Sequence, residues 1–175
     1  MVEQTRAEFG RIDALVNNAG IYRAAETLDV TEEHWDAIMN INAKGVFFVT
    51  QAVLPTMIAQ KRGVIVSLAS MAGKIGSRAN LPYNASKAAV ISMTKSFAVA
   101  HAADGIRVNC VCPGTFRSAI HDGLPDEALE AIAARHPLGL GSAADLVGAY
   151  SFLASDDSRW TTGAALVIDG GYAAP

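Results

Sequence analysis

Short apolar runs alternate with longer stretches of helical character along this chain. Four runs are rich in Val, Ile or Leu and are bounded by turn-forming residues, which is typical of buried strands. They are IDALV at 12–16, VIVSLAS at 64–70, IRVNCVC at 106–112 and ALVID at 165–169. Side chains alternate along a strand, so one set in the third run is expected to share a face. That set is Ile106, Val108, Cys110 and Cys112.

Helices are expected to fill the intervals between these strands. The expected ranges are 1–9, a helix after Thr31, 43–60, 83–101, 126–134 and 143–154. Gly10 suits a helix C-terminus, and Thr31 suits an N-cap because its side-chain oxygen can accept from the first turn. Ser142 and Asp145 have the spacing of a capping box. Pro55 is expected to kink the helix over 43–60.

This order of strands and helices predicts an α/β fold. We expect a Rossmann-like, doubly wound parallel sheet in a three-layer αβα arrangement, with residues 1–175 forming a single domain. In such sheets, ligands bind beyond the carboxyl ends of the strands. The motifs NNAG at 17–20, SLAS at 67–70 and CPGT at 112–115 stand at those ends. The architecture therefore predicts a site there.

Composition excludes several classes of partner. The chain of 175 residues is 51% hydrophobic and 18% charged, which fits a globular domain. A net charge of −3 with scattered Lys and Arg argues against nucleic acid. No apolar run of membrane-spanning length is evident, and no membrane partner is expected. Cys110 and Cys112 are expected to be small buried hydrophobes without a disulfide, which fits a cytoplasmic protein.

Tyr83 and Lys87 stand four residues apart on a predicted helix, so their side chains share one face. A free tyrosine has a pKa of about 10, and a neighbouring ammonium stabilises the phenolate and lowers that pKa. The pair is then suited to exchanging a proton with an alcohol or carbonyl oxygen. By itself the spacing favours an ordinary pair on a helix surface, so the surrounding residues decide.

Two further polar residues stand near predicted element ends. Ser70 closes a predicted strand, and a hydroxyl there can donate to a substrate oxygen as oxyanion-stabilising groups do. Asn42 lies where one predicted helix passes into the next, and a local cap is its alternative role.

With these residues in place, the chain resembles the short-chain dehydrogenase/reductase family along essentially its whole length. The matching segments are NNAG at 17–20, WDAIMNINAKGVF around Asn42, GVIVSLASMAG around Ser70, YNASK at 83–87, GIRVNCVCPG at 105–114 and SFLASDDSRWTTGAALVIDGG near the end. The resemblance implies an oxidoreductase that uses NAD or NADP and interconverts a small-molecule alcohol and ketone by hydride transfer.

The resemblance also implies a role for each matching residue. Tyr83 would be the general acid and base, and Lys87 would lower its pKa and hold the nicotinamide ribose. Ser70, chosen over Ser67 by its spacing to Tyr83, would position and polarise the substrate oxygen. Asn42 would hold a water that relays protons towards Lys87.

Further matching residues would contact the cofactor in addition to Tyr83 and Lys87. They are Asn18, Ala19 and Gly20 after the first strand, and Pro113, Gly114, Phe116 and Ser118 in the segment expected to wrap the nicotinamide. Glycine at 114 would let the backbone come close. Asn17 is expected to tie neighbouring strands together instead.

One part of the family pattern has no counterpart here. The family normally begins with a strand and a Thr-Gly-x-x-x-Gly-x-Gly turn that packs the cofactor pyrophosphate against a helix N-terminus. No glycine cluster of that spacing precedes NNAG, so the first three strands of the sheet are expected to be missing. The strand at 12–16 would then be a bare edge.

Three explanations of this difference are open. The start is wrongly placed or the chain cut short; a true fragment pairs its edge with another copy; or another polypeptide supplies the first half. We favour the first explanation, in which the sequence is a truncated form of an ordinary enzyme. The alternative function is an inactive fragment or assembly module without a complete cofactor site.

Other residues receive weaker interpretations. The four histidines share no metal-ligand spacing and are expected to be solvated or capping residues, and Trp35 and Trp160 to be packing anchors. An apolar lid over the substrate, or else a mobile loop, is expected from Phe116, Ile120, Leu124 and Leu129. A homodimer or homotetramer interface, or else core packing, is expected from Phe47, Val90, Met93 and Phe97.

Overall fold

A computed structural model describes residues 1–118 and 125–174, and its strands form one parallel sheet. The strand order is β1 (Ala14–Asn17), β2 (Gly63–Leu68), β3 (Ile106–Pro113) and β4 (Ala165–Ile168). Each neighbouring pair is parallel, with Val16 opposite Val66, and Ser67 opposite Cys110. β1 therefore lies at one edge of the described sheet. The predicted α/β fold with a parallel sheet is confirmed.

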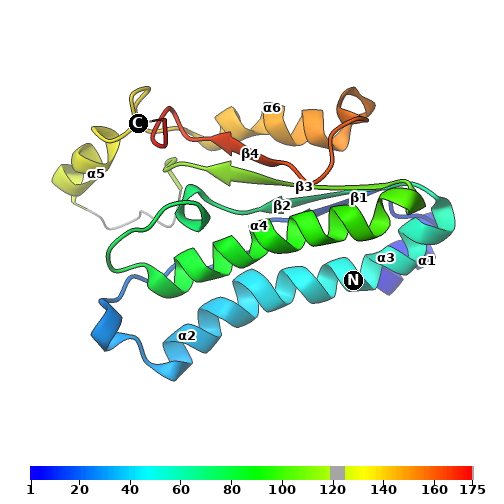
Figure 1. The fold of residues 1–175 in the computed structure, drawn as a ribbon, viewed down its shortest axis with the longest axis horizontal. Coiled ribbons are helices and arrows are strands. Elements are labelled where there is room, and N and C mark those ends of the chain that lie inside the picture. Colours follow the sequence, from blue (N-terminus) through cyan, green and yellow to red (C-terminus); the bar gives the residue numbers. More distant parts are fainter. Residues whose placement is uncertain (119–124, 175) are drawn as a thin grey trace.

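Helices cover both faces of this sheet (Figure 1). On one face lie α3 (Val46–Gln60) and α4 (Leu81–His101), and α2 (Glu32–Met39) continues the line of α3. On the other face lies α6 (Ala143–Ala154). The arrows of β3 and β4 point towards the end of the molecule where α5 (Asp126–Ala133) and the C-terminus lie, and α1 (Val2–Phe9) lies at the opposite end.

Alternation along the strands explains the two cores. Ile106 and Val108 pack with Met57 of α3, and Cys110 and Cys112 pack with Val90 of α4. The four β3 side chains expected to share a face do so, and both cysteines are free and buried. A second set on the opposite face packs against α6; its members are Val64, Val66 and Val111 with Ala149 and Leu153. Full burial of each large aliphatic side chain contributes about 1.5–3 kcal/mol.

Local signals placed most element ends correctly. Gly10 ends α1 with a left-handed φ of 70°, and Thr31 caps α2 by accepting from the His34 amide. Ser142 and Asp145 form the capping box of α6. These ends follow from short-range hydrogen bonding, which is why residue type alone predicts them.

Three element predictions need correction. The first strand covers Ala14–Asn17 rather than 12–16, because Ile12 is held by the Gln60 side chain instead of by a ladder. The segment before α3 is a π-helix, η2 (Asn40–Gly45), and α3 itself begins at Val46 and runs through Pro55 without interruption. α4 begins at Leu81 because Pro82 is tolerated in a first helical turn.

Two predictions about surfaces are wrong. Trp160 is 98% exposed and anchors no packing within the described chain. The helical stretch Glu32–Gln60 is long and apolar enough to cross a membrane by length and composition alone, although no such run was expected. Core helices of globular proteins pass the same test, and here Val53 and Met57 of this stretch are buried against the sheet.

Candidate active site

The carboxyl end of β1 is tied to its neighbours by Asn17. Its amide Nδ2 donates to Thr50 Oγ1 at 3.1 Å and to Ser67 Oγ at 3.2 Å, and all three side chains are buried. This confirms the expectation that Asn17 links neighbouring strands. It also makes Ser67 a structural residue and leaves Ser70 as the serine next to open space.

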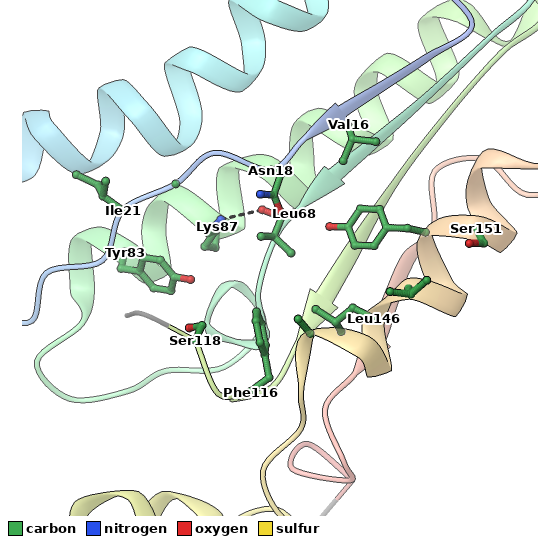
Figure 2. Close-up of a pocket in the computed structure, with 14 residues that line it drawn as sticks. Val16, Asn18, Ile21, Leu68, Tyr83, Lys87, Phe116, Ser118, Leu146 and Ser151 are labelled. Carbon is green, nitrogen blue, oxygen red and sulfur yellow. Dashed lines mark hydrogen bonds between the residues drawn. The ribbon is translucent and has the colours of Figure 1, made fainter. Parts of the chain in front are cut away.

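The first turns of α4 place Tyr83 and Lys87 beside that end of the sheet. Lys87 is only 3% exposed, and its Nζ donates to the backbone oxygen of Leu68 at 2.7 Å. The same Nζ lies 5.6 Å from the centroid of the Tyr83 ring. Tyr22 packs edge-on against Tyr83, with 5.2 Å between ring centroids. Figure 2 shows Tyr83 and Lys87 on the same opening, facing Phe116 and Ser118.

Ser70 joins this group from the end of β2. It caps the short 3₁₀ turn η3 (Met71–Gly73), because its Oγ accepts from the Ala72 amide at 3.1 Å. Its hydroxyl also lies close enough to that of Tyr83 to lower the Tyr83 pKa in part. The structure therefore brings together Ser70, Tyr83 and Lys87, as the sequence predicted.

Burial dominates the electrostatics of the pair. Burial raises the pKa of Tyr83; the neighbouring Ser70 hydroxyl lowers it in part, and the nearby Tyr22 raises it. Burial also lowers the pKa of Lys87 to about 8. The Lys87 ammonium is directed at Leu68, and its expected lowering of the Tyr83 pKa stays a prediction.

Asn42 is fully buried in the π-helix η2, where its side chain holds a neighbouring segment. Its Oδ1 accepts from the Ile21 amide at 2.8 Å, and its Nδ2 donates to the Ile21 carbonyl at 2.9 Å. The same Nδ2 donates to Ser86 Oγ at 3.2 Å. A side chain on Gly20 would come within 3.3 Å of Asn42 Oδ1 and 3.6 Å of Lys87 Nζ. Glycine at 20 therefore lets the chain pass close to both residues.

Two cavities meet at Tyr83. The first, of about 640 Å³, is lined by Asn18, Gly20 and Lys87 among others. The second, of about 470 Å³, is lined by Ser70 and largely by apolar side chains. Four residues line both cavities: Leu68, Tyr83, Phe116 and Ser118. Tyr83 therefore lies between the two adjoining cavities and is accessible from both.

The remaining residues expected to contact a cofactor are divided between these cavities. Pro113 and Gly114 line the second cavity, and Ala19 lines neither. A side chain on Gly114 would lie 2.8 Å from the Asp169 Cα, so glycine here permits a close approach to the segment after β4. The predicted lid is only partly described: Phe116 lines both cavities, Leu129 lines neither, and Ile120 and Leu124 lie outside the described residues.

Two residues at these cavities were missed by sequence reasoning. His136, expected to be solvated or capping, is 4% exposed and hydrogen-bonds with the Thr115 amide. Tyr150 lines the first cavity, and burial raises its pKa to about 12. Neither residue belongs to a recognisable spacing, so no local signal could have found them. Among the described residues, no cluster of three His, Cys, Asp or Glu side chains could hold a metal ion.

Comparison with known proteins agrees with this arrangement. The sequence model of a family described as enoyl-(acyl carrier protein) reductase matches residues 1–173. The 3-oxoacyl-(acyl-carrier-protein) reductase FabG of Thermotoga maritima is 46% identical over 98% of this chain and 70% of its own length. The (2S)-((R)-hydroxy(phenyl)methyl)succinyl-CoA dehydrogenase subunit BbsD of Thauera aromatica is 43% identical over 98% and 69%.

Solved structures show the same fold. A gluconate 5-dehydrogenase from Burkholderia cenocepacia, crystallised with NADP and tartrate, superposes with a TM-score of 0.96 at 36% identity, covering 99% of this chain and 69% of that one. A short-chain type dehydrogenase/reductase from Mycobacterium marinum gives a TM-score of 0.95 at 39% identity, covering 99% and 70%.

Proposed function

Because this chain belongs to the short-chain dehydrogenase/reductase family and is an NAD(P)-dependent oxidoreductase that interconverts an alcohol and a carbonyl group, we propose that Tyr83, Ser70 and Lys87 form its reaction centre. The observation that carries this proposal is the position of Tyr83, which lines both cavities. A proton donor at the junction of two cavities can serve a reaction between molecules held one in each.

The first cavity fits the nicotinamide end of NAD or NADP. Asn18 and Lys87 offer donors there, and the missing side chain of Gly20 leaves backbone accessible. Together with Phe116, these residues would hold the cofactor, which when bound supplies or accepts the hydride. Lys87 donates to Leu68 and retains donor capacity for ribose hydroxyls.

The second cavity would hold the substrate. In carbonyl reduction, the Tyr83 hydroxyl donates a proton to the carbonyl oxygen while Ser70 donates a hydrogen bond to the same oxygen. Burial raises the pKa of Tyr83, so its phenol stays protonated at neutral pH and ready to donate. In alcohol oxidation the proton returns to Tyr83. The proton relay through Asn42 stays a prediction, while its contacts with Ile21 support a role in positioning Gly20 beside Lys87.

An acyl thioester is the substrate class that the relatives and the cavity favour together. Two of the relatives are named for acyl groups carried on acyl carrier protein or coenzyme A. The wall of the second cavity includes Met71, Ile75, Ala128 and Ile132, which suit an acyl chain better than a polyhydroxylated sugar acid. Reduction of acetoacetyl-CoA should therefore exceed oxidation of gluconate in side-by-side assays.

Replacing Tyr83 with Phe tests the proposal. Tyr83→Phe should lower turnover by about 10²–10⁴-fold while leaving the free energy of unfolding and NADPH affinity within about twofold. Tyr22→Phe removes a hydroxyl that donates to Asn80 at 2.6 Å and should lose less than about tenfold. Turnover by Tyr83→Phe equal to the unaltered chain would remove Tyr83 from the chemistry.

The alternative of an inactive fragment has its own test. Titration of NADH and NADPH against the purified chain, followed by nicotinamide fluorescence, separates the two functions. Saturable binding would contradict the inactive fragment, and absence of binding would contradict a self-sufficient enzyme.

We further propose that residues 1–175 act as one domain of a cytoplasmic homodimer or homotetramer. The free cysteines at 110 and 112 support a reducing compartment. Exposed aromatic side chains on α3, Phe47 and Phe48, support association between copies of the chain.

A further inference from the structure

His136 lies between two parts of the molecule that border the second cavity. It stands three residues after the last residue of α5, and it lines the cavity together with Ser70, Tyr83 and Thr115. The side chain is 4% exposed and packs beside Tyr172, with 4.6 Å between ring centroids. A buried imidazole next to a reaction centre must have both ring nitrogens satisfied.

The two hydrogen bonds of the ring fix its tautomer. Nδ1 lies 2.9 Å from the backbone oxygen of Ile132, which can only accept, so Nδ1 carries the proton. Nε2 accepts from the Thr115 amide at 3.0 Å, so Nε2 must carry a lone pair. The ring is therefore neutral in this arrangement. A second proton would set the Nε2 hydrogen against the Thr115 hydrogen.

Thr115 belongs to the segment that lines both cavities. The Gly114 amide donates to Ile168, and the Thr115 carbonyl accepts from Gly141, so this backbone is fixed by β4 and by the segment before α6. Within residues 1–118 and 125–174, the Thr115 amide donates to His136 alone. Phe116, the next residue, lines both cavities. A displacement of the Thr115 backbone therefore also moves Phe116, which forms part of the wall shared by the two cavities.

We propose that His136 is a positioning residue, whose Nε2 holds the Thr115 amide and thereby fixes the Gly114–Phe116 backbone for the bound nicotinamide. This inference rests on the proposed function, because it takes the first cavity as the cofactor site. It assigns His136 no contact with the reacting atoms.

The test combines a spectroscopic signature with a binding measurement on the 175-residue chain. In nitrogen-15 NMR, loss of the acceptor in His136→Leu should shift the Thr115 amide and speed its hydrogen exchange relative to the unaltered chain. NADH is then titrated by fluorescence against both chains at one pH. The NADH dissociation constant of His136→Leu should be at least about threefold higher.

His136→Gln is the informative variant, because its amide oxygen can accept from Thr115. It should keep the Thr115 amide protected and NADH affinity near that of the unaltered chain. His136→Leu, which offers no acceptor, should lose both. His101→Gln, at the far end of α4, should behave as the unaltered chain does.

The outcomes separate the inference from the proposed function. A Thr115 amide that exchanges equally slowly in His136→Leu overturns the inference, as does NADH binding that is equally strong in His136→Leu and the unaltered chain. Absence of NADH binding by the unaltered chain would overturn the proposed function of this chain together with the inference. Weak NADH binding by His136→Leu with affinity retained in His136→Gln supports the inference.

Discussion

At the residue scale, Lys87 combines deep burial with a position beside the reaction centre. Burial lowers its pKa to about 8, whereas a lysine in an unfolded chain titrates near 10.4. The unfolded state therefore binds more protons between those values, and stability rises with pH across that window. Below about pH 8 the full cost of the buried ammonium is present. The buried Lys87 ammonium therefore costs stability, as groups that serve function often do.

Lys87→Met should consequently make the chain more stable at neutral pH while impairing cofactor binding. The free energy of unfolding in urea should rise by about 1–2 kcal/mol at pH 7, after allowing for the lost hydrogen bond to Leu68. The difference should shrink by about pH 9.5, because the native lysine is then mostly neutral. Lys95→Met, at an exposed position on the same helix, should change stability by less than about 0.5 kcal/mol.

A lower stability of Lys87→Met at both pH values would contradict this account of Lys87.

The Tyr83 and Lys87 pair also shows what sequence spacing can predict about a residue. The four-residue separation placed Tyr83 and Lys87 on one opening correctly. It could not predict that both groups lose water on burial, which raises the pKa of Tyr83 and lowers the pKa of Lys87. His136 escaped detection because its partners lie at Ile132 and Thr115, and only the fold brings the latter close.

At the element scale, the π-helix η2 explains how Asn42 reaches the segment after β1. A π-turn inserts one residue into an otherwise regular helix and is often found at functional sites. Here it accompanies a buried amide that satisfies both backbone groups of Ile21. The sequence indicated a junction at this point but not its geometry, because no residue pattern distinguishes a π-turn from continuous α-helix.

Removal of the Asn42 amide should loosen this junction. Asn42→Ala leaves the Ile21 amide and carbonyl without partners and should lower the free energy of unfolding by about 1–3 kcal/mol. Amide hydrogen exchange at Ile21 should accelerate, and NADH affinity should fall, since Gly20 lies beside Lys87. Asn40→Ala, at an exposed position in the same π-helix, is the matched control. Equal stability of the two variants would refute the anchoring role.

At the scale of the whole molecule, alternation of strands and helices was sufficient to predict the parallel sheet. Each strand is short and apolar, and each connection contains a helix, so few other topologies were available. Which outer residues are exposed could not be predicted in the same way. The pattern leaves an interface and core packing open for Val90, which is fully buried, and it predicts packing for Trp160, which is exposed. Both outcomes depend on neighbours distant in sequence.

The exposed aromatic group on α3 and α4 carries the prediction about assembly. Phe47 contacts Phe48 and Phe97, with ring centroids 5.2 and 5.7 Å apart, and Phe48 is 53% exposed. Aromatic side chains gathered in this way commonly anchor an interface. Phe48→Glu should therefore shift the chain to a monomer in sedimentation velocity, because association would bury an unpaired carboxylate.

Trp160→Glu is the control for this prediction, since it replaces an even more exposed aromatic side chain, which lies in the segment between α6 and β4. It should leave the sedimentation coefficient unchanged. If Phe48→Glu sediments as the unaltered oligomer does, the interface lies elsewhere, and if the unaltered chain is itself a monomer, the proposed homo-oligomer is wrong. Because α4 carries both Phe97 and the Tyr83 pair, loss of assembly should also reduce turnover more than it reduces stability.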